Sequence, residues 1–406
     1  MEAHITQRHD IAIVGGGITA WATAYHLRQL GATDVCLIHD PERPSATLAC
    51  PGWLAGGMAD NYTRLSHGFG RAFAQEIWAF GNAAQAMACR YLTEQAIPHQ
   101  KGRRLRLAST EHEVKELAIA VRELHADGFG GAELVTGPAV QARFPLLSAR
   151  VLGVQIDDAL AARVDPALFL PSFAPPKPAP PAIEGRVSQL RETSTGVTLT
   201  VTLPHGEVQT HSAELVVLAC HHFMKDLVPA LREAVVPYGD QVARLGALPA
   251  GDAPHFLVAS HNHGYEWLLH TPDSSYLGGG RYLRKWAGIG EEQPSATPRI
   301  AAKVAQSLNA LFVQGADGPP STPPLLSQLT TTGDPWGLVE VRPCDELPLI
   351  GPMFGCDRVL LATGFMGQGL TLGFMAGLCL AELIVSGKSP RLPRRLWPER
   401  LRSLAD

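Results

Sequence analysis

The chain has 406 residues, 46% of them hydrophobic, and a net charge of −4. A chain of this length exceeds one typical hydrophobic core, so we expect two closely joined globular domains. The slightly acidic charge balance excludes a general electrostatic attraction to nucleic acid or to anionic membranes.

The first residues contain no basic segment followed by an apolar one, so we expect no signal peptide. The seven cysteines are odd in number and form no C-x-x-C pair, which predicts free thiols in a reducing cytoplasm. Residues 359–381 are apolar and uncharged, but glycines and Gln368 interrupt them. They therefore predict a buried strand, loop and helix rather than a membrane span. The histidines at 221–222 and 261–263 have no third ligand at suitable spacing, so we expect no metal.

The first predicted element is an apolar strand over residues 10–14, which runs directly into a glycine-rich turn from Gly15 to Ala20. A helical pattern follows at once. In this context G-x-G-x-x-G/A is typical of a dinucleotide site. Gly15 permits the tight turn, Gly17 lets the backbone approach a pyrophosphate, and Ala20 keeps the helix close to the strand. A purely structural glycine-rich turn is the alternative.

A second apolar strand over residues 35–38 ends at His39 and Asp40. An acidic side chain at this place accepts hydrogen bonds from the adenosine ribose in dinucleotide sites. Asp40 lies 25 residues beyond Gly15, whereas His39 occupies the position that is usually acidic. Both residues are therefore candidates for the ribose contact.

The middle of the chain alternates between element types. Residues 70–126 predict helix, and the proline-rich residues 171–181 predict a stiff extended connector that cannot be helical. Residues 186–210 alternate like a meander of strands. The apolar residues 215–219 predict a buried parallel strand that returns to the first sheet.

The carboxy-terminal half predicts a second sheet and a final helix. The candidate strands of that sheet are residues 267–270, 275–282 and 337–342. Residues 358–362 predict a strand that leads through a glycine-rich loop into the helix. Gly369, Gly373 and Gly377 leave one face of this helix without side chains. We expect that face to press against a cofactor or a sheet.

In its motifs the sequence resembles the D-amino acid oxidase superfamily of FAD-dependent oxidoreductases over nearly the whole chain. The amino-terminal signature is shared with many flavoproteins. The carboxy-terminal one is more telling, because Trp336 to Pro343, then residues 345–352 and then residues 362–371 match the family in order and spacing. Glycine oxidase, sarcosine oxidase and the oxidase that trims tRNA wobble uridine are the kinds that it resembles most.

The resemblance implies an α/β protein: a Rossmann-like FAD-binding domain of the glutathione-reductase type with a second, mainly antiparallel β-sheet substrate domain. The FAD-binding domain would comprise residues 1–80, 150–235 and 345–406. The substrate-binding domain would comprise residues 81–149 and 236–344.

By the same resemblance, FAD would be held without a covalent bond, with its pyrophosphate at the first glycine turn and its ring at the loop before the last helix. The expected cofactor-binding residues are Gly15, Gly16, Gly17, Ile18, Thr19, Ala20, His39, Asp40, Thr47, Val187, Ala219, Cys220, Gly364, Met366, Gly367, Gln368, Gly369, Leu370 and Thr371.

Arg342 aligns with the arginine that holds the substrate carboxylate in glycine oxidase, and its planar fork of donors suits that role. A surface salt bridge is the alternative for this residue. Arg281 or Lys285 would place positive charge near the flavin, and an ordinary surface cation is the alternative for either. Gln368 stands where many relatives have a histidine. We expect Arg342, Gln368 and Arg281 to be catalytic, and Arg342, Tyr265 and Tyr282 to bind substrate.

The expected function is oxidation of a C–N bond in a small amine or amino acid. Hydride would pass to flavin N5, the resulting imine would hydrolyse, and O2 would reoxidise the flavin. The alternatives are a dehydrogenase that passes electrons to a quinone or a partner protein, a tRNA-modifying oxidase, and a flavin-binding module without catalysis. We expect no nucleic-acid partner, and a homo-oligomer stays open.

Overall fold

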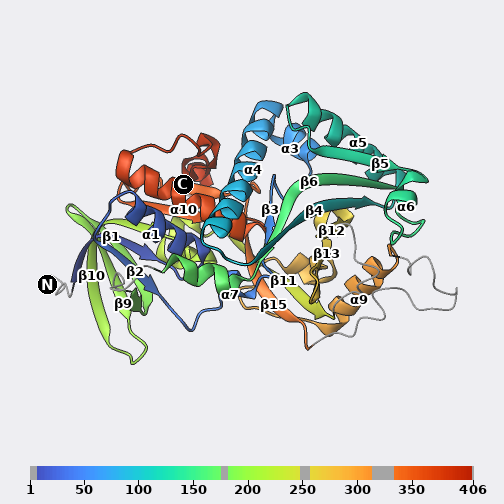
Figure 1. Ribbon diagram of the computed structural model, residues 1–406. Coiled ribbons are helices and arrows are strands. Elements are labelled where there is room, and N and C mark those ends of the chain that lie inside the picture. Colours follow the sequence, from blue (N-terminus) through green and yellow to red (C-terminus); the bar gives the residue numbers. More distant parts are fainter. Residues whose placement is uncertain (1–6, 175–181, 247–256, 313–332, 405–406) are drawn as a thin grey trace.

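A computed structural model describes residues 7–174, 182–246, 257–312 and 333–404, which form two β-sheets with helices packed around them (Figure 1). The sheet at the left of Figure 1 carries the amino-terminal strand, and the sheet at the right carries the middle of the chain. This arrangement confirms the predicted α/β class with two sheets.

The first sheet is a mainly parallel, dinucleotide-type sheet, and its central path runs in the order β16-β17-β10-β1-β2-β7. The long strand β10 joins two kinds of pairing. Its residues 208–213 pair antiparallel with β9, its residues 211–218 pair parallel with β1, and its residues 216–218 pair parallel with β17. The buried parallel strand predicted at residues 215–219 is thereby confirmed. The described strands of the first sheet are β1 (Gln7–Val14), β2 (Val35–His39), β7 (Ala182–Glu184), β8 (Arg186–Thr193), β9 (Gly196–Thr202), β10 (Val208–Leu218), β16 (Leu349–Pro352) and β17 (Val359–Thr363).

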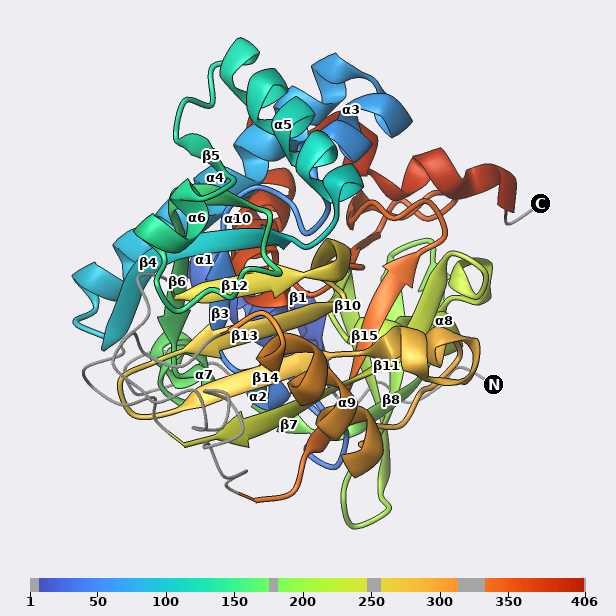
Figure 2. The same ribbon diagram turned by 90° about the vertical axis from the view of Figure 1, so that its right-hand side faces the viewer.

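The second sheet is mainly antiparallel and follows the order β15-β11-β14-β13-β12-β4-β6-β3, with β5 paired to β6. Figure 2 views it from the front, with β12, β13 and β14 crossing the picture. Its described strands are β3 (Trp53–Ala55), β4 (His99–Ala108), β5 (Ala132–Thr136), β6 (Gly153–Val164), β11 (Val235–Leu245), β12 (Val258–His261), β13 (Glu266–His270), β14 (Ser275–Gly279) and β15 (Trp336–Pro343).

Helices pack against both sheets, and α4 runs along the middle of the molecule (Figure 1). Short 3-10 turns fill several connections. The described α-helices are α1 (Ile18–Gln29), α2 (Ala46–Ala49), α3 (Tyr62–Phe69), α4 (Arg71–Glu94), α5 (Glu111–Ala126), α6 (Ala139–Arg143), α7 (Pro166–Phe169), α8 (Met224–Leu227), α9 (Pro298–Asn309) and α10 (Gly369–Ser386).

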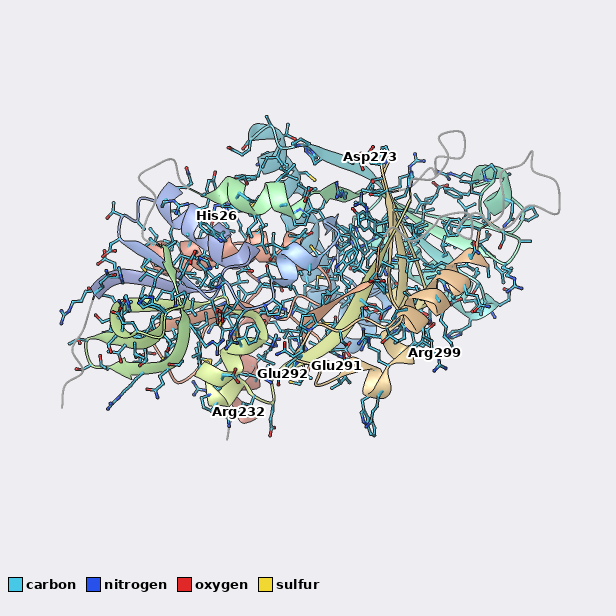
Figure 3. All side chains as sticks on the ribbon, turned by 90° about the horizontal axis from the view of Figure 1, so that it is seen from below. His26, Arg232, Asp273, Glu291, Glu292 and Arg299 are labelled. Carbon is cyan, nitrogen blue, oxygen red and sulfur yellow. The ribbon has the colours of Figure 1, made fainter. Side chains whose placement is uncertain are left out.

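The glycine face of α10 packs against α1. A Cβ at Gly373 would lie 2.7 Å from Thr19 Oγ1, and a Cβ at Gly377 would lie 2.7 Å from the Cβ of Ala22. The predicted partner, a cofactor or a sheet, was wrong at these two positions, because the missing side chains let two helix backbones approach each other. His26, which Figure 3 labels on α1, contacts Phe374 in a tilted arrangement with 5.2 Å between ring centroids, and burial lowers the pKa of His26 to about 4.

Helix α10 is long and apolar enough to cross a membrane, with a mean hydropathy of 1.8, and 67% of it is buried inside the molecule. It lies against α1 and α4, which is the setting of a core helix. Among the described residues it alone meets this criterion. That the protein does not span a membrane stays a prediction.

Two predicted elements were wrong. Within residues 70–126, which were expected to be helical, residues 99–108 form β4. Arg104 and Arg106 point inward there, so the strand lacks the alternation of apolar and polar residues that would reveal it. In the proline-rich connector, Leu170–Phe173 form a 3-10 turn, because proline tolerates the first turn of a helix; residues 175–181 lie outside the described residues.

The division into two domains stays a prediction, but the sheets refine where its boundaries would fall. Strands β3 and β6 pair with each other in the second sheet, whereas the predicted division assigns residues 1–80 and 150–235 to the FAD-binding domain. The chain therefore crosses between the two sheets more often than the motifs suggest.

Candidate functional site

A cavity of about 920 Å³ is lined by residues of both sheets. On one side lie the carboxyl ends of β1, β2, β10 and β17, the edge at which parallel sheets bind nucleotides. On the other side lie β11, β15 and the second half of β4, which contributes Arg104 and Arg106. Nearly all of the expected cofactor-binding residues line this one cavity.

The glycine turn after β1 lines the cavity and packs closely against the chain after β10. Gly15 has φ +142°, and a Cβ there would lie 2.3 Å from the carbonyl oxygen of Ala219. Helix α1 starts directly afterwards, and its N-cap residue, Gly17, has no side chain to cap it. The backbone N–H of Ile18 donates to Thr47 Oγ1 over 3.0 Å, so Thr47 positions this turn. A helix start of this kind suits a pyrophosphate.

At the end of β2, Asp40 and His39 have different surroundings. Asp40 accepts hydrogen bonds from Arg186 Nε over 2.9 Å and from the backbone of Glu42 over 3.1 Å. Burial alone would raise the pKa of Asp40, but these bonds and the charges of Arg186 and Arg43 outweigh it and lower the pKa. The His39 side chain instead packs against Gly16, whose Cβ would lie 3.1 Å from that of His39. Both line the cavity, and which of them contacts the ribose stays a prediction.

The loop before α10 forms the other end of the cavity. Gly364, Met366 and Gly367 all have positive φ, and no described side chain caps the start of α10. Gln368 donates from Nε2 to the carbonyl of Gly57 over 3.3 Å, so it ties this loop to the residues after β3. An irregular backbone followed by an uncapped helix start suits a flavin ring that accumulates negative charge.

Three expected site residues do not line the cavity. Ala20 is buried in the first turn of α1, where it keeps the helix close to its neighbours. The Thr371 hydroxyl accepts the backbone N–H of Ala55 over 3.0 Å and so holds β3. Tyr282 is 44% exposed and donates to Glu266 Oε1. A direct contact with cofactor or substrate is therefore not supported for these three residues.

Arg342 points from β15 into the cavity, as expected, but its guanidinium forms an ion pair with Glu346. Glu346 has φ +62° and also lines the cavity. To hold a substrate carboxylate, Arg342 would have to exchange this partner. The salt bridge considered as the alternative thus exists, at the rim of the cavity.

Arg281 lines the same cavity and forms no ion pair with any described residue. Its Nη2 donates to the hydroxyl of Tyr265 over 3.1 Å. Its guanidinium carbon lies 4.6 Å from the ring centroid of Tyr265 and 5.2 Å from that of Tyr238. The structure therefore brings together Arg281, Tyr265 and Arg342, as the sequence analysis expected.

The sequence analysis missed two carboxylates in this wall, Asp240 on β11 and Glu340 on β15. Tyr238 lies opposite Glu340 in the pairing of β11 with β15, and its hydroxyl donates to Glu340 Oε2. Burial and then the charge of Asp240 raise the pKa of Glu340 to about 7. Burial raises the pKa of Asp240 to about 6. The period of two residues from Glu340 to Arg342 was the signal that could have placed Glu340 on the cavity face.

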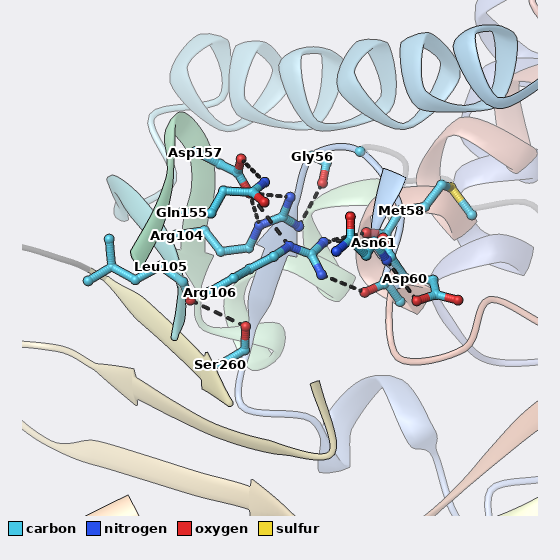
Figure 4. Close-up of polar contacts among 12 residues, drawn as sticks. Gly56, Met58, Asp60, Asn61, Arg104, Leu105, Arg106, Gln155, Asp157 and Ser260 are labelled. Carbon is cyan, nitrogen blue, oxygen red and sulfur yellow. Dashed lines mark hydrogen bonds and ion pairs between the residues drawn. The ribbon is translucent and has the colours of Figure 1, made fainter. Parts of the chain in front are cut away.

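A buried group of two arginines and one aspartate, also missed, lies beside the cavity (Figure 4). Arg104 donates from Nε to Asp157 over 2.9 Å. Arg106 donates from Nη1 and Nη2 to the carbonyls of residues 58–60. Burial and the charge of Arg104 lower the pKa of Arg106 to about 10. Arg104 also donates to the carbonyl of Gly56 over 3.0 Å. The pair therefore fastens residues 56–60, the segment that Gln368 contacts.

Among the described residues no group of three or more His, Cys, Asp or Glu is arranged to hold a metal ion. That the whole protein binds no metal stays a prediction. All seven cysteines are free. Cys344 is exposed and does not line the cavity.

Comparisons with known proteins agree with this geometry. A family model described as "DAO: FAD dependent oxidoreductase" matches residues 10–383. Among proteins with curated descriptions, none matches the sequence. The solved structures with a similar fold include three enzymes: L-proline dehydrogenase from P. horikoshii (17% identity, TM-score 0.74, 98% of each chain), glycine oxidase from Geobacillus kaustophilus (17%, 0.73, 97% of this chain and 98% of the other) and iminodiacetate oxidase from Chelativorans sp. BNC1 (20%, 0.68, 96% and 98%).

At such identities the three structures show a shared fold and no more. The family model, however, spans most of the chain and includes both glycine-rich signatures and the strand of Arg342. Its cofactor also fits the cavity described above, which has a volume of about 920 Å³ and is lined by the residues of both glycine-rich signatures. The chain therefore belongs to the DAO family of FAD-dependent oxidoreductases.

Proposed function

We propose that the protein oxidises the C–N bond of a small amine or amino acid. The observation that carries this proposal is the single cavity, which joins the glycine turn after β1 to a wall that holds Arg281, Arg342 and Glu340. FAD, when bound, supplies the hydride acceptor. The protein supplies the geometry around it.

In this proposal Gly15, Gly17 and the first turn of α1 hold the pyrophosphate, and residues 364–369 contact the flavin ring. FAD is bound without a covalent link. Arg342 binds an acidic group of the substrate after releasing Glu346, and Arg281 adds a second positive charge on the same wall. The substrate carbon that carries nitrogen is thereby aimed at the flavin, and orientation supplies much of the rate enhancement. The resulting imine hydrolyses in water.

Two oxidants for the reduced enzyme are compatible with this site. We propose O2, because Arg281 places positive charge in the cavity without an ion-pair partner among the described residues. A dehydrogenase that passes electrons to a quinone or protein is the second candidate, because the fold is shared with an L-proline dehydrogenase as well as with oxidases. Stopped-flow mixing of the reduced enzyme with O2 separates the two.

The function itself is tested without oxygen. Purified holoenzyme is mixed with a panel of amines and amino acids, and the flavin absorbance is followed. We expect bleaching by at least one member that carries a carboxylate. A flavin that stays oxidised with every amine and amino acid, in protein that holds FAD, would refute the proposal. The cytoplasmic location stays a prediction.

A further inference from the structure

Glu340 has no ion-pair partner among the described residues, although it lies in the wall of the cavity. Its carboxylate oxygens lie 3.6 and 3.8 Å from the position that a Cβ would take at Gly367. Gly367 belongs to the loop before α10, which we assign to the flavin ring. The carboxylate therefore lies beside the place where the reacting part of a substrate would bind.

The groups around Glu340 come from several elements and have opposing effects on its pKa. The hydroxyl of Tyr238 and the charge of Arg281 lower it, and the charge of Asp240 raises it. Cys50 lies close enough to feel the charge of Glu340, although burial dominates the raised pKa of that thiol. Arg342, two residues along β15, is engaged by Glu346.

This local charge balance favours a cation. Asp240 and Glu340 are two carboxylates, and Arg281 is one guanidinium. Arg342 is paired with Glu346, and Arg284, whose charge also lowers the pKa of Asp240, is paired with Glu291. Neither Asp240 nor Glu340 forms an ion pair with any described residue. Burial and the repulsion between Glu340 and Asp240 raise the pKa of Glu340 to about 7, which is close to neutral pH.

Amine oxidation needs a proton acceptor of this kind. An alkylammonium group has a pKa near that of lysine, about 10, so roughly one amine in 10³ is neutral at pH 7. Only the neutral amine has a lone pair on nitrogen that can form the C=N bond as hydride leaves the carbon. A base in the site is most effective when its pKa lies near the working pH.

We propose that Glu340 is a catalytic base that takes a proton from the ammonium group of the substrate, and that Tyr238, Asp240 and Arg281 are positioning residues that tune it. The N–H bond breaks, its electron pair stays on nitrogen, and an O–H bond forms on Glu340. The C–H bond then gives its two electrons and its hydrogen to FAD, the oxidant, while the nitrogen lone pair forms the iminium. Water hydrolyses the iminium to a carbonyl compound and ammonium, and Glu340 returns its proton to water.

This inference rests on the proposed function, and its test separates the two. The rate of flavin reduction is measured by anaerobic stopped flow from pH 5.5 to 10, with wild type and Glu340→Gln. In wild type we expect the rate at low substrate to rise through a limb near pH 7. In Glu340→Gln that limb should vanish, the rate should follow the pKa of the amine itself, and the loss at pH 7 should be on the order of 10²-fold or more.

A substrate analogue distinguishes two roles of Glu340: a catalytic base, or only the acceptor of the hydrogen bond from Tyr238. An amine of the same shape with electron-withdrawing substituents and a pKa below 7 is already neutral, so Glu340→Gln should reduce its flavin at nearly the wild-type rate. An equal loss with both amines, or a limb near pH 7 that persists in the variant, would overturn the proposal. Glu207→Gln, an exposed glutamate on the hairpin between β9 and β10, is the matched control and should behave as wild type.

The positioning residues give a second test that does not need Glu340→Gln to fold. Tyr238→Phe removes a donor to the charged form and should move the limb to higher pH, whereas Asp240→Asn removes a repelling charge and should move it to lower pH. FAD content and melting temperature report on folding. Shifts in the same direction, or none, would contradict the assignment. Failure of wild type itself to be reduced by any amine would instead count against the proposed function.

Discussion

Arg342→Ala separates a carboxylate-binding arginine from a rim salt bridge. If Arg342 serves only Glu346, with 31% and 39% of the two side chains exposed, its loss should cost less than about 1 kcal/mol of stability and leave kcat/KM unchanged. If Arg342 binds the substrate carboxylate, truncation should cost about 2–5 kcal/mol in transition-state binding. That range corresponds to a fall of about 30-fold to about 4000-fold in kcat/KM.

The ion pair with Glu346 sets where in that range the result should fall. Removing Arg342 leaves Glu346 unpaired in the cavity, where it repels a substrate carboxylate. We therefore expect the upper part of the range for Arg342→Ala and a partial recovery when Glu346→Gln is added. Arg342→Lys should also recover only part, because an ammonium cannot reproduce the planar fork of donors.

The assay compares kcat/KM for an amino-acid substrate with kcat/KM for the amine that lacks its carboxylate. Arg342→Ala should lower the first and spare the second, with unchanged FAD content. Arg244→Ala, which removes an exposed guanidinium on β11, is the matched control. Equal losses with both substrates, or none with the amino acid, would refute the role of Arg342.

Three further predictions follow from packing and buried charge. Gly15→Val should distort the turn between β1 and α1 and yield protein without FAD, because its Cβ would lie 2.3 Å from the carbonyl oxygen of Ala219. Acid precipitation of wild type should release its flavin into solution. Flavin that stays on the protein after that treatment would contradict the non-covalent site. Gly377→Val should lower the free energy of unfolding by about 1–3 kcal/mol through overpacking against α1, whereas Gly68→Ala in α3, which has open space around it, should not. Asp157→Asn should cost about 3–5 kcal/mol in denaturant unfolding, because it leaves two arginines buried without a carboxylate; a cost below about 1 kcal/mol would show that the backbone carbonyls compensate them.

Most of the residues that the sequence predicts to bind the cofactor line one cavity, because the turns that carry them are local in the sequence. Gly15, Gly17 and the start of α1 act through neighbouring residues, so their spacing alone carries the mechanism. The loop from Gly364 to Gly369 is local in the same sense. Thr371 was misplaced because its hydroxyl reaches Ala55, far away in the chain, instead of the cavity.

The substrate half depends on contacts between distant segments. Glu340 and Asp240 become neighbours only through the register of β11 and β15, which no pattern within either segment reveals. Arg104 and Arg106 made β4 hard to recognise in the sequence, because charged residues at inward positions of a strand are rare. Here they are paired with the carboxylate of Asp157 from β6. Tyr282 is an aromatic residue near the cavity whose direction depends on a partner, Glu266, in another strand.

The central claim is that this FAD enzyme oxidises a C–N bond, and one anaerobic measurement tests it most directly. The best substrate from the amine panel is titrated into holoenzyme without oxygen, the loss of oxidised flavin is read from its absorbance, and the carbonyl product and ammonium are quantified. The account predicts one carbonyl compound and one ammonium, or one shorter amine from a secondary substrate, for each FAD reduced. Flavin reduction without release of either nitrogen product, or no reduction by any amine, would contradict it.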